Sequence, residues 1–586
     1  MRNPHLAVRV RHLALGMTLL VASALLIGSG ARPPFTVHDK AHYASAELAS
    51  FIRPGLVLKI LSGQIAADGV ISVRFRLTDP KGLPLDRDGI LTPGPTTVAF
   101  AAGRIPAGEG QFRSYTTRVF TNTITGASVT DPWTDAGGKF EKTGDGEYAY
   151  TFNTRAPTGF DRTVTHRIGG QASRDLREFG MSRYADNDVY TFVPNGSRVT
   201  VVRDVVRTET CNKRCHDPLA VHGGNRRKTE LCIMCHQPEN QDPYGGSLNF
   251  PVLVHRIHMG KDLPSVKAGK PLLIAGVGPN NDFSDVDFPA HVINCEVCHD
   301  PKSGAAQADS WLKPYRAACS ACHDDVNFAT GENHDNIVQV DDSQCAVCHA
   351  PDDKVEFGLS IKGAHTEPRF SRDLPGTTFE ILAVDDGVAG KNPIVTFTIK
   401  DKAGDPIPAS KMDRVALVLA GPTSDYAAST YTAEDVRRAE GPGDGTHYWT
   451  FINTRIPANA KGTYSVGIEG YRNIKLLEGT KKEMTVLDPG INKVFYFSVD
   501  GSRVEPRRKV VDIEKCNACH LKLELHGRNR NRPEHCVQCH NPNHTDEARR
   551  PKSESPAQTV NFRTMIHRIH TGKDLKIEFT VYGFGG

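Results

Sequence analysis

Strict alternation of apolar and polar residues marks several short segments of the chain. Ile71, Val73, Phe75 and Leu77 alternate with serine and arginine, and the same period of two recurs at 148–152 and 395–399. Successive side chains of a strand point to opposite faces, so this pattern predicts half-buried strands. Glycine, proline and aspartate interrupt the runs. The pattern therefore predicts short antiparallel strands in sandwich or barrel domains.

Two other regions lack periodic apolar runs and are rich in cysteine, histidine and turn residues. We therefore predict strand-rich domains at residues 32–205 and 371–510, and irregular, partly helical domains at residues 206–370 and 511–586. The expected fold is mainly β, with two antiparallel β domains alternating with two ligand-rich domains.

The N-terminus has a pattern of its own. Arg2, Arg9 and Arg11 precede an uncharged run from Leu13 to Ala31 that ends in small residues. This order is typical of a secretory signal at residues 1–31, and the alternative is a retained membrane anchor. No cysteine follows the run, so lipoprotein processing there is not expected. We expect an exported protein.

Charge excludes one class of function. The chain has 71 basic and 67 acidic residues, and its formal net charge is +4. A dedicated nucleic-acid-binding protein would show a basic domain or stripe. We expect no nucleic-acid partner.

All 14 cysteines occur in pairs, and each pair is followed at once by histidine. Six pairs have the spacing C-x-x-C-H, and the first pair has one extra residue between its cysteines. The cysteines are Cys211, Cys215, Cys232, Cys235, Cys295, Cys298, Cys319, Cys322, Cys345, Cys348, Cys516, Cys519, Cys536 and Cys539. The histidines that follow are His216, His236, His299, His323, His349, His520 and His540.

C-x-x-C-H is the attachment motif of c-type haem. Two thiols bind the porphyrin edge and the adjacent histidine becomes the proximal iron ligand. Zinc sites and disulfides also use paired cysteines, but neither needs a histidine after each pair. Cys211 and Cys215 still share one face of a helical turn. The sequence therefore predicts seven covalently attached haems c, with the first site the least regular.

Further histidines are candidates for the second axial position. In the first ligand-rich domain these are His222, His255, His258, His334 and His365, which match its five motifs in number. His255 and His258 share a helical face, so each can reach a different iron. Methionine is scarce, which favours histidine on both sides and low reduction potentials. We assign no iron to His291.

The chain contains an internal repeat. Residues 211–236 match 516–540, and VHRIHMGKDL matches IHRIHTGKDL. The second copy has three candidate distal histidines, His526, His567 and His570, for two motifs. One ligand is thus orphaned, which predicts a C-terminal truncation or a heptahaem protein that uses the spare histidine elsewhere. We interpret His535 and His544 as surface residues.

Several of these segments resemble the OmcA/MtrC family of outer-surface decahaem c-type cytochromes. They are RPGLVLKI, CNKRCHDPLAVHGG, HRIHMGKDLPS and CHDDVNFATGENH. The resemblance implies split-barrel β domains alternating with multihaem domains, and bis-histidine ligation at the histidines named above. It also implies electron transfer to ferric minerals or soluble acceptors. The implied partners are other multihaem cytochromes and an outer-membrane porin–cytochrome conduit.

The chain departs from the family pattern in three respects. It has seven motifs instead of ten, no lipidation cysteine, and no spare cysteines for a disulfide in its second β domain. Surface anchoring is therefore open, and the expected location is the outer surface, the exterior or the periplasm.

We expect an electron carrier without catalytic residues, or at most a non-specific ferric reductase. One alternative is a multihaem reductase of nitrite or a sulfur oxyanion, which needs an open axial position. Another is a non-catalytic adhesion or assembly protein with vestigial haem.

Overall fold

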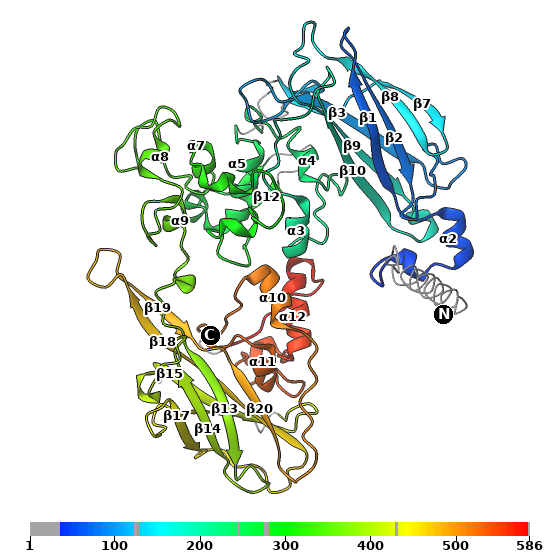
Figure 1. Ribbon diagram of the computed structural model, residues 1–586. Coiled ribbons are helices and arrows are strands. Elements are labelled where there is room, and N and C mark those ends of the chain that lie inside the picture. The colour runs from blue at the N-terminus through cyan, green and yellow to red at the C-terminus, as the bar shows by residue number, and fades with distance from the viewer. Residues whose placement is uncertain are drawn as a thin grey trace, which may run out of the picture. The chain divides into compact units, whose positions relative to one another are not determined.

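The computed structural model describes residues 35–121, 126, 128–242, 245–274, 281–427 and 432–583. The predicted signal or anchor at residues 1–31 lies outside these ranges. The described residues form two compact units (Figure 1). The first contains residues 35–286, 296–311 and 317–327, and the second contains 287–295, 312–316 and 328–583. Each unit joins a strand-rich region to segments that carry motifs.

The strand-rich region of the first unit consists of two four-stranded antiparallel sheets and a hairpin. The sheet orders are β1-β2-β8-β7 and β10-β9-β3-β4, and β5 pairs with β6. The strands are β1 (Val57–Ile65), β2 (Val70–Thr78), β3 (Thr96–Arg104), β4 (Arg113–Ser114), β5 (Thr117–Thr121), β6 (Ser128–Pro132), β7 (Lys139–Gly144), β8 (Glu147–Arg155), β9 (His166–Asp175) and β10 (Arg183–Phe192).

One hydrophobic core joins these two sheets. The predicted inward residues of β2 are fully buried, whereas its two arginines, Arg74 and Arg76, are exposed. Phe75 of β2 packs against Phe100 of β3, with ring centres 5.1 Å apart. The alternation in sequence thus marks the strand face that turns to the core, as predicted.

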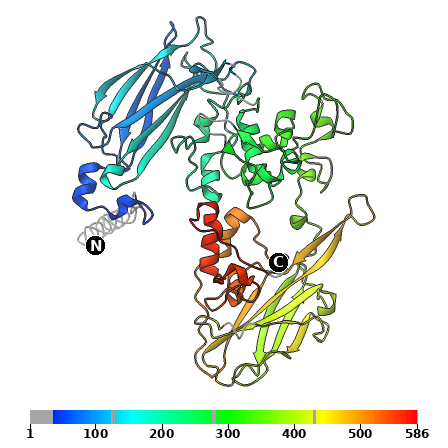
Figure 2. The ribbon, with the colours of Figure 1, turned by 180° about the vertical axis from the view of Figure 1, so that it is seen from behind.

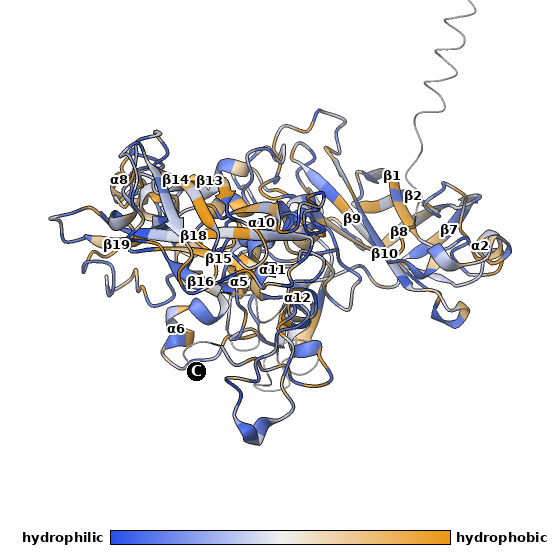
Figure 3. Ribbon diagram, turned by 90° about the horizontal axis from the view of Figure 1, so that it is seen from below, coloured by the Kyte–Doolittle hydropathy of each residue, from blue (hydrophilic) through white to orange (hydrophobic). Residues whose placement is uncertain are grey.

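The second unit has an antiparallel strand-rich region of similar design. Its sheets have the orders β13-β14-β17 and β16-β15-β18-β19, with β20 also paired to β18. The strands are β13 (Thr378–Asp385), β14 (Ile394–Lys400), β15 (Arg414–Ala420), β16 (Thr432–Asp435), β17 (Thr446–Thr450), β18 (Thr463–Leu476), β19 (Met484–Pro489) and β20 (Lys493–Ser498). Hydrophobic residues are concentrated on strands such as β1 and β13 (Figure 3).

The motif-bearing segments are irregular chain with short helices. Two short strands, β11 (Leu273–Ile274) and β12 (Asn281–Asp282), also occur there. The helices of these segments are α3 (Thr208–Arg214), α4 (Thr229–Cys232), α5 (Phe250–Met259), α6 (Pro264–Lys267), α7 (Arg316–Cys319), α8 (Cys345–Cys348), α9 (Ile361–Ala364), α10 (Ile513–His520), α11 (Pro533–Cys539) and α12 (Phe562–Thr571). A further helix, α2 (Ala46–Ile52), lies near the N-terminal end of the described chain.

Helices α5 and α12 occupy equivalent places in the repeat. Each follows an asparagine and ends at a glycine of positive φ, Gly260 at 44° and Gly572 at 51°. Glycine adopts such angles readily, so both helices end directly after their paired histidines.

The last helices, red in Figures 1 and 2, lie beside the strand-rich region of their own unit. Mainly antiparallel β structure alternating with short-helix segments confirms the predicted fold class. In the described ranges, no helix has the length and apolar character needed to cross a bilayer.

Candidate haem sites

Each motif forms a compact helical turn. The amide of the motif histidine donates to the carbonyl of the first cysteine at His236–Cys232, His349–Cys345 and His540–Cys536, with distances of 2.9–3.0 Å. The first motif makes the same bond despite its extra residue, since the amide of His216 lies 3.1 Å from the Cys211 carbonyl oxygen. The turn therefore accommodates the extra residue, Arg214, and the histidine stays hydrogen-bonded to the first cysteine.

Six motif histidines lie opposite a predicted distal histidine, with ring centres 5.9–6.3 Å apart. The pairs are His216–His258 (6.2 Å), His236–His222 (6.0 Å), His299–His255 (6.3 Å), His349–His334 (6.2 Å), His520–His570 (6.2 Å) and His540–His526 (5.9 Å).

This spacing fits two imidazoles on opposite sides of one metal ion. A histidine nitrogen binds such an ion at about 2 Å, and the ring centre lies about 1 Å further out, so two axial rings have centres about 6 Å apart. In the described ranges, no three His, Cys, Asp or Glu side chains converge as ligands for a metal ion. The 14 cysteines, all of which lie in the described ranges, form no disulfide in the structure. The histidines thus meet in twos, as axial haem ligation requires.

Backbone carbonyls orient most of these imidazoles. A carbonyl can only accept, so each Nδ1 beside one carries the proton and leaves Nε2 as the metal-binding nitrogen. The Nδ1 partners are the carbonyls of Leu248 for His236, Val254 for His258, Ile337 for His334, Leu359 for His349, Ile361 for His365, Pro289 for His520, Val560 for His540 and Ile566 for His570, at 2.7–3.0 Å.

Burial keeps several of these rings neutral. It lowers the pKa of His255 to about 4, and the neighbouring His299 contributes further. Burial likewise lowers the pKa of His236 and His299. Neutral imidazole is the form that binds a metal ion, so these environments suit ligation.

Exposed apolar side chains cluster along the chain around one pair. Ile337 and Leu359, whose carbonyls orient His334 and His349, are 50% and 64% exposed, and Val347 inside the motif is 73% exposed. Exposed apolar residues gathered at one place usually mark a surface that another group covers. A porphyrin is an apolar plate of the kind they fit.

The remaining predicted ligands are His323, His365 and His567. The assignment of His323 as a proximal ligand and of His365 as a distal ligand stays a prediction. His567 and His570 both lie on α12, but His570 is the one that faces a motif histidine. His567 is exposed, and in the described part of the chain its ring faces no second imidazole.

The prediction that His535 and His544 are surface residues is wrong for His535, which is 1% exposed. Its Nε2 lies 3.0 Å from a carboxylate oxygen of Glu469. His544 is half-buried, and its Nδ1 donates to the Cys539 carbonyl at 2.8 Å. The repeat held a signal for this, because His535 aligns with the apolar Leu231.

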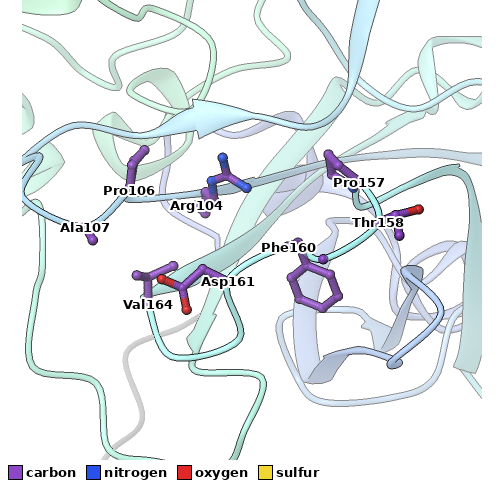
Figure 4. Close-up of a pocket in the computed structure, with 9 residues that line it drawn as sticks. Arg104, Pro106, Ala107, Pro157, Thr158, Phe160, Asp161 and Val164 are labelled. Carbon is purple, nitrogen blue, oxygen red and sulfur yellow. The ribbon is translucent and has the colours of Figure 1, made fainter.

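An open pocket of about 410 Å³ lies in the first strand-rich region (Figure 4). Arg104 and Asp161 line it together with Pro106, Pro157 and Phe160. None of its lining residues belongs to a motif or to a histidine pair.

Imidazole pairs at axial spacing, built on C-x-x-C-H turns, are features of a multihaem c-type cytochrome. Residues 203–359 and 508–582 match the family model described as outer membrane cytochrome MtrC/MtrF-like, domains II/IV. This match and the shared fold described below confirm the predicted resemblance to the OmcA/MtrC family.

Two solved structures share the fold over most of the chain. The outer membrane decaheme cytochrome OmcA is 20% identical with a TM-score of 0.65, and the alignment covers 88% of this chain and 81% of OmcA. MtrC from Shewanella baltica OS185 is 22% identical with a TM-score of 0.62, and the alignment covers 89% of this chain and 85% of that protein. A sequence search of curated proteins gives no match.

Proposed function

We propose that the protein is an electron-transfer cytochrome that carries seven covalently attached haems c, each held between two histidines. The observation that carries this proposal is the set of six imidazole pairs at 5.9–6.3 Å. The haems supply one-electron chemistry, and the chain determines their spacing, orientation and electrostatic surroundings.

The chain's own residues perform three tasks in this function. The motif cysteines would attach each haem covalently, the paired imidazoles would hold its iron, and the backbone carbonyls orient those imidazoles. Both Nδ1 protons of the His334–His349 pair, for example, are held by carbonyls 2.8 and 3.0 Å away. Rigid axial ligands keep structural change on reduction small, which favours electron transfer.

The proposed acceptors are extracellular ferric minerals or soluble oxidants, and the proposed partners are other multihaem cytochromes and an outer-membrane porin–cytochrome conduit. The support is the fold shared with OmcA and MtrC, of which the first is described as an outer membrane decaheme cytochrome. The protein would then work at the outer surface, in the exterior or in the periplasm.

The paired imidazoles disfavour the alternative of a nitrite or sulfur-oxyanion reductase. Such an enzyme needs an iron with an open axial position. Each of the six pairs would hold an iron with two histidines, so a substrate would have to displace one of them.

Three measurements on the native holoprotein test the proposal. Its intact mass should exceed that of the polypeptide by seven haems, and the ferric protein should give low-spin electron paramagnetic resonance (EPR) signals. The reduced protein should be reoxidised rapidly by ferric citrate. A substantial high-spin ferric signal, or a reduced protein that ferric citrate does not reoxidise, would overturn it.

A further inference from the structure

The two copies of the repeat make the same strand–helix contact with different chemistry. In the first unit, α4 packs on β9 at Gly169, and in the second α11 packs on β18 at Gly467 (Figure 1). A Cβ at Gly169 would lie 2.6 Å from Leu231, and one at Gly467 would collide with His535 and Gln538. Both contacts are tight, but the second is polar where the first is apolar.

The strand residue two positions after each glycine is neutral in the first copy and negatively charged in the second. Gln171 accepts a hydrogen bond from Arg226 Nε at 3.0 Å. At the equivalent place, Glu469 accepts from Arg530 Nε at 2.6 Å and from His535 Nε2 at 3.0 Å. Glu469 is 0% exposed, so its negative charge is little screened by water.

Glu469 is ionised in this setting. Burial would raise its pKa, but the hydrogen bonds from His535 and Arg530 hold the pKa well below its usual range. Arg414 also contacts the carboxylate, but its side chain is 39% exposed and its charge is therefore better screened.

Each arginine belongs to the small hairpin that carries a predicted distal ligand. Val221 pairs with Arg226 on either side of His222, and Leu525 pairs with Arg530 on either side of His526. The ring of His222 lies 6.0 Å from that of His236, and the ring of His526 lies 5.9 Å from that of His540, between ring centres. Each arginine therefore lies on the segment that holds one histidine of the pair, and its positive charge acts on that site.

Reduction of a haem adds one negative charge to the site. A nearby positive charge stabilises the reduced state, and a buried carboxylate opposes it. Arg226 faces a neutral amide, and Arg167, which is 7% exposed, adds a second cation that donates to the Glu230 carbonyl. In the second copy Ser465 stands in the place of Arg167, and the negative charge of Glu469 offsets the positive charge of Arg530.

We propose that Glu469 gives the haem at Cys536 and His540 a lower reduction potential than the equivalent haem at Cys232 and His236. An electron shared by these two sites then resides mainly on the first copy. Glu469 acts through Arg530 and is a tuning residue. This inference rests on the proposed haem ligation.

The test is a redox titration of the full-length holoprotein and of two reciprocal variants. Glu469→Gln keeps the side-chain shape and an oxygen that accepts from Arg530. One haem should shift to higher potential, with about a tenfold rise in its reduced-to-oxidised ratio at fixed applied potential, or about 59 mV. Gln171→Glu should shift one haem to lower potential.

The outcomes separate tuning from folding and from ligation. Unchanged low-spin spectra in both variants would show that the ligands are intact. Unchanged potentials in both variants, or a downward shift in Glu469→Gln, would overturn the inference. If Glu469→Gln fails to assemble, Gln171→Glu decides: a downward shift supports the inference and no shift overturns it. A wild-type protein without haem waves would instead refute the proposed function.

Discussion

The ring planes of His520 and His570 meet at 85°, close to perpendicular, across a centre-to-centre distance of 6.2 Å. The equivalent pair in the first copy, His216 and His258, repeats the arrangement at 88°. The other four pairs are tilted by 34–42°. The repeat therefore conserves not only which histidines face each other but also the angle between them.

The angles predict two classes of low-spin haem. The relative orientation of axial imidazoles determines the splitting of the iron d orbitals, and a near-perpendicular pair gives the more anisotropic EPR signal. We expect two haems of the anisotropic class in the ferric protein. A spectrum of one uniform rhombic class would contradict this expectation.

Replacing His570 should open one iron, whereas replacing His567 should not. His570→Ala removes the ring that faces His520, so one haem should become high-spin. His567→Ala is the matched control on the same helix. EPR of both variants distinguishes them, and a high-spin signal in His567→Ala alone would reverse the assignment.

Deleting Arg214 should leave seven haems in place. The deletion restores C-x-x-C-H at the first motif, and the Cys211 carbonyl already accepts from the His216 amide. Replacing both Cys211 and Cys215 by alanine should remove one haem. Intact mass measures both outcomes, and an unchanged mass gain in the double variant would show that the irregular motif binds no haem covalently.

His166 should make the first strand-rich region less stable in mild acid. It is 0% exposed, and burial lowers its pKa below the usual value near 6.5. Above that value both folded and unfolded chains hold a neutral ring. Below it the unfolded chain takes up the proton first, so the free energy of unfolding falls by up to about 1.4 kcal/mol per pH unit.

The check is unfolding of the full holoprotein between pH 5 and 7, followed by hydrogen exchange in β9. His166→Gln should flatten the pH dependence and reduce stability at pH 7 by about 1–2 kcal/mol, because the hydrogen bond from Tyr115 is weakened. The exposed His291→Gln is the control. An equally steep pH dependence in His166→Gln would assign the effect to other groups.

Gly467→Ala should destabilise the second unit by about 1–3 kcal/mol, since the added Cβ overlaps His535 and Gln538. Gly110→Ala is a suitable control because a Cβ there meets no atom within 4 Å. Chemical denaturation measures both. Adding Gln538→Ala to Gly467→Ala should recover part of the loss, and no recovery would place the overlap at His535.

Much of the fold could be predicted from local patterns. Alternation at 71–77 identifies β2 because one face of that strand is buried and the other is in water. The motif spacing predicts helical turns, and the separation of His255 and His258 predicts that each serves a different site. These features depend on residues a few positions apart, so the sequence contains them directly.

Other features depend on residues far apart in the chain. Which of His255 and His258 faces His299 is determined by the packing of α5, not by its sequence. The polar side chain of His535 predicts a surface position, since its buried partner, Glu469, lies 66 positions earlier on β18. Only tertiary packing shows that a buried histidine has replaced a leucine of the other copy.

One turn of α5 also has a consequence for how its unit is connected. His255 faces a motif that follows it in the chain, and His258 faces one that precedes it. As ligands, the two histidines would join haems attached before and after α5 to a single helical turn, so a change in the position of this helix would act on both sites at once.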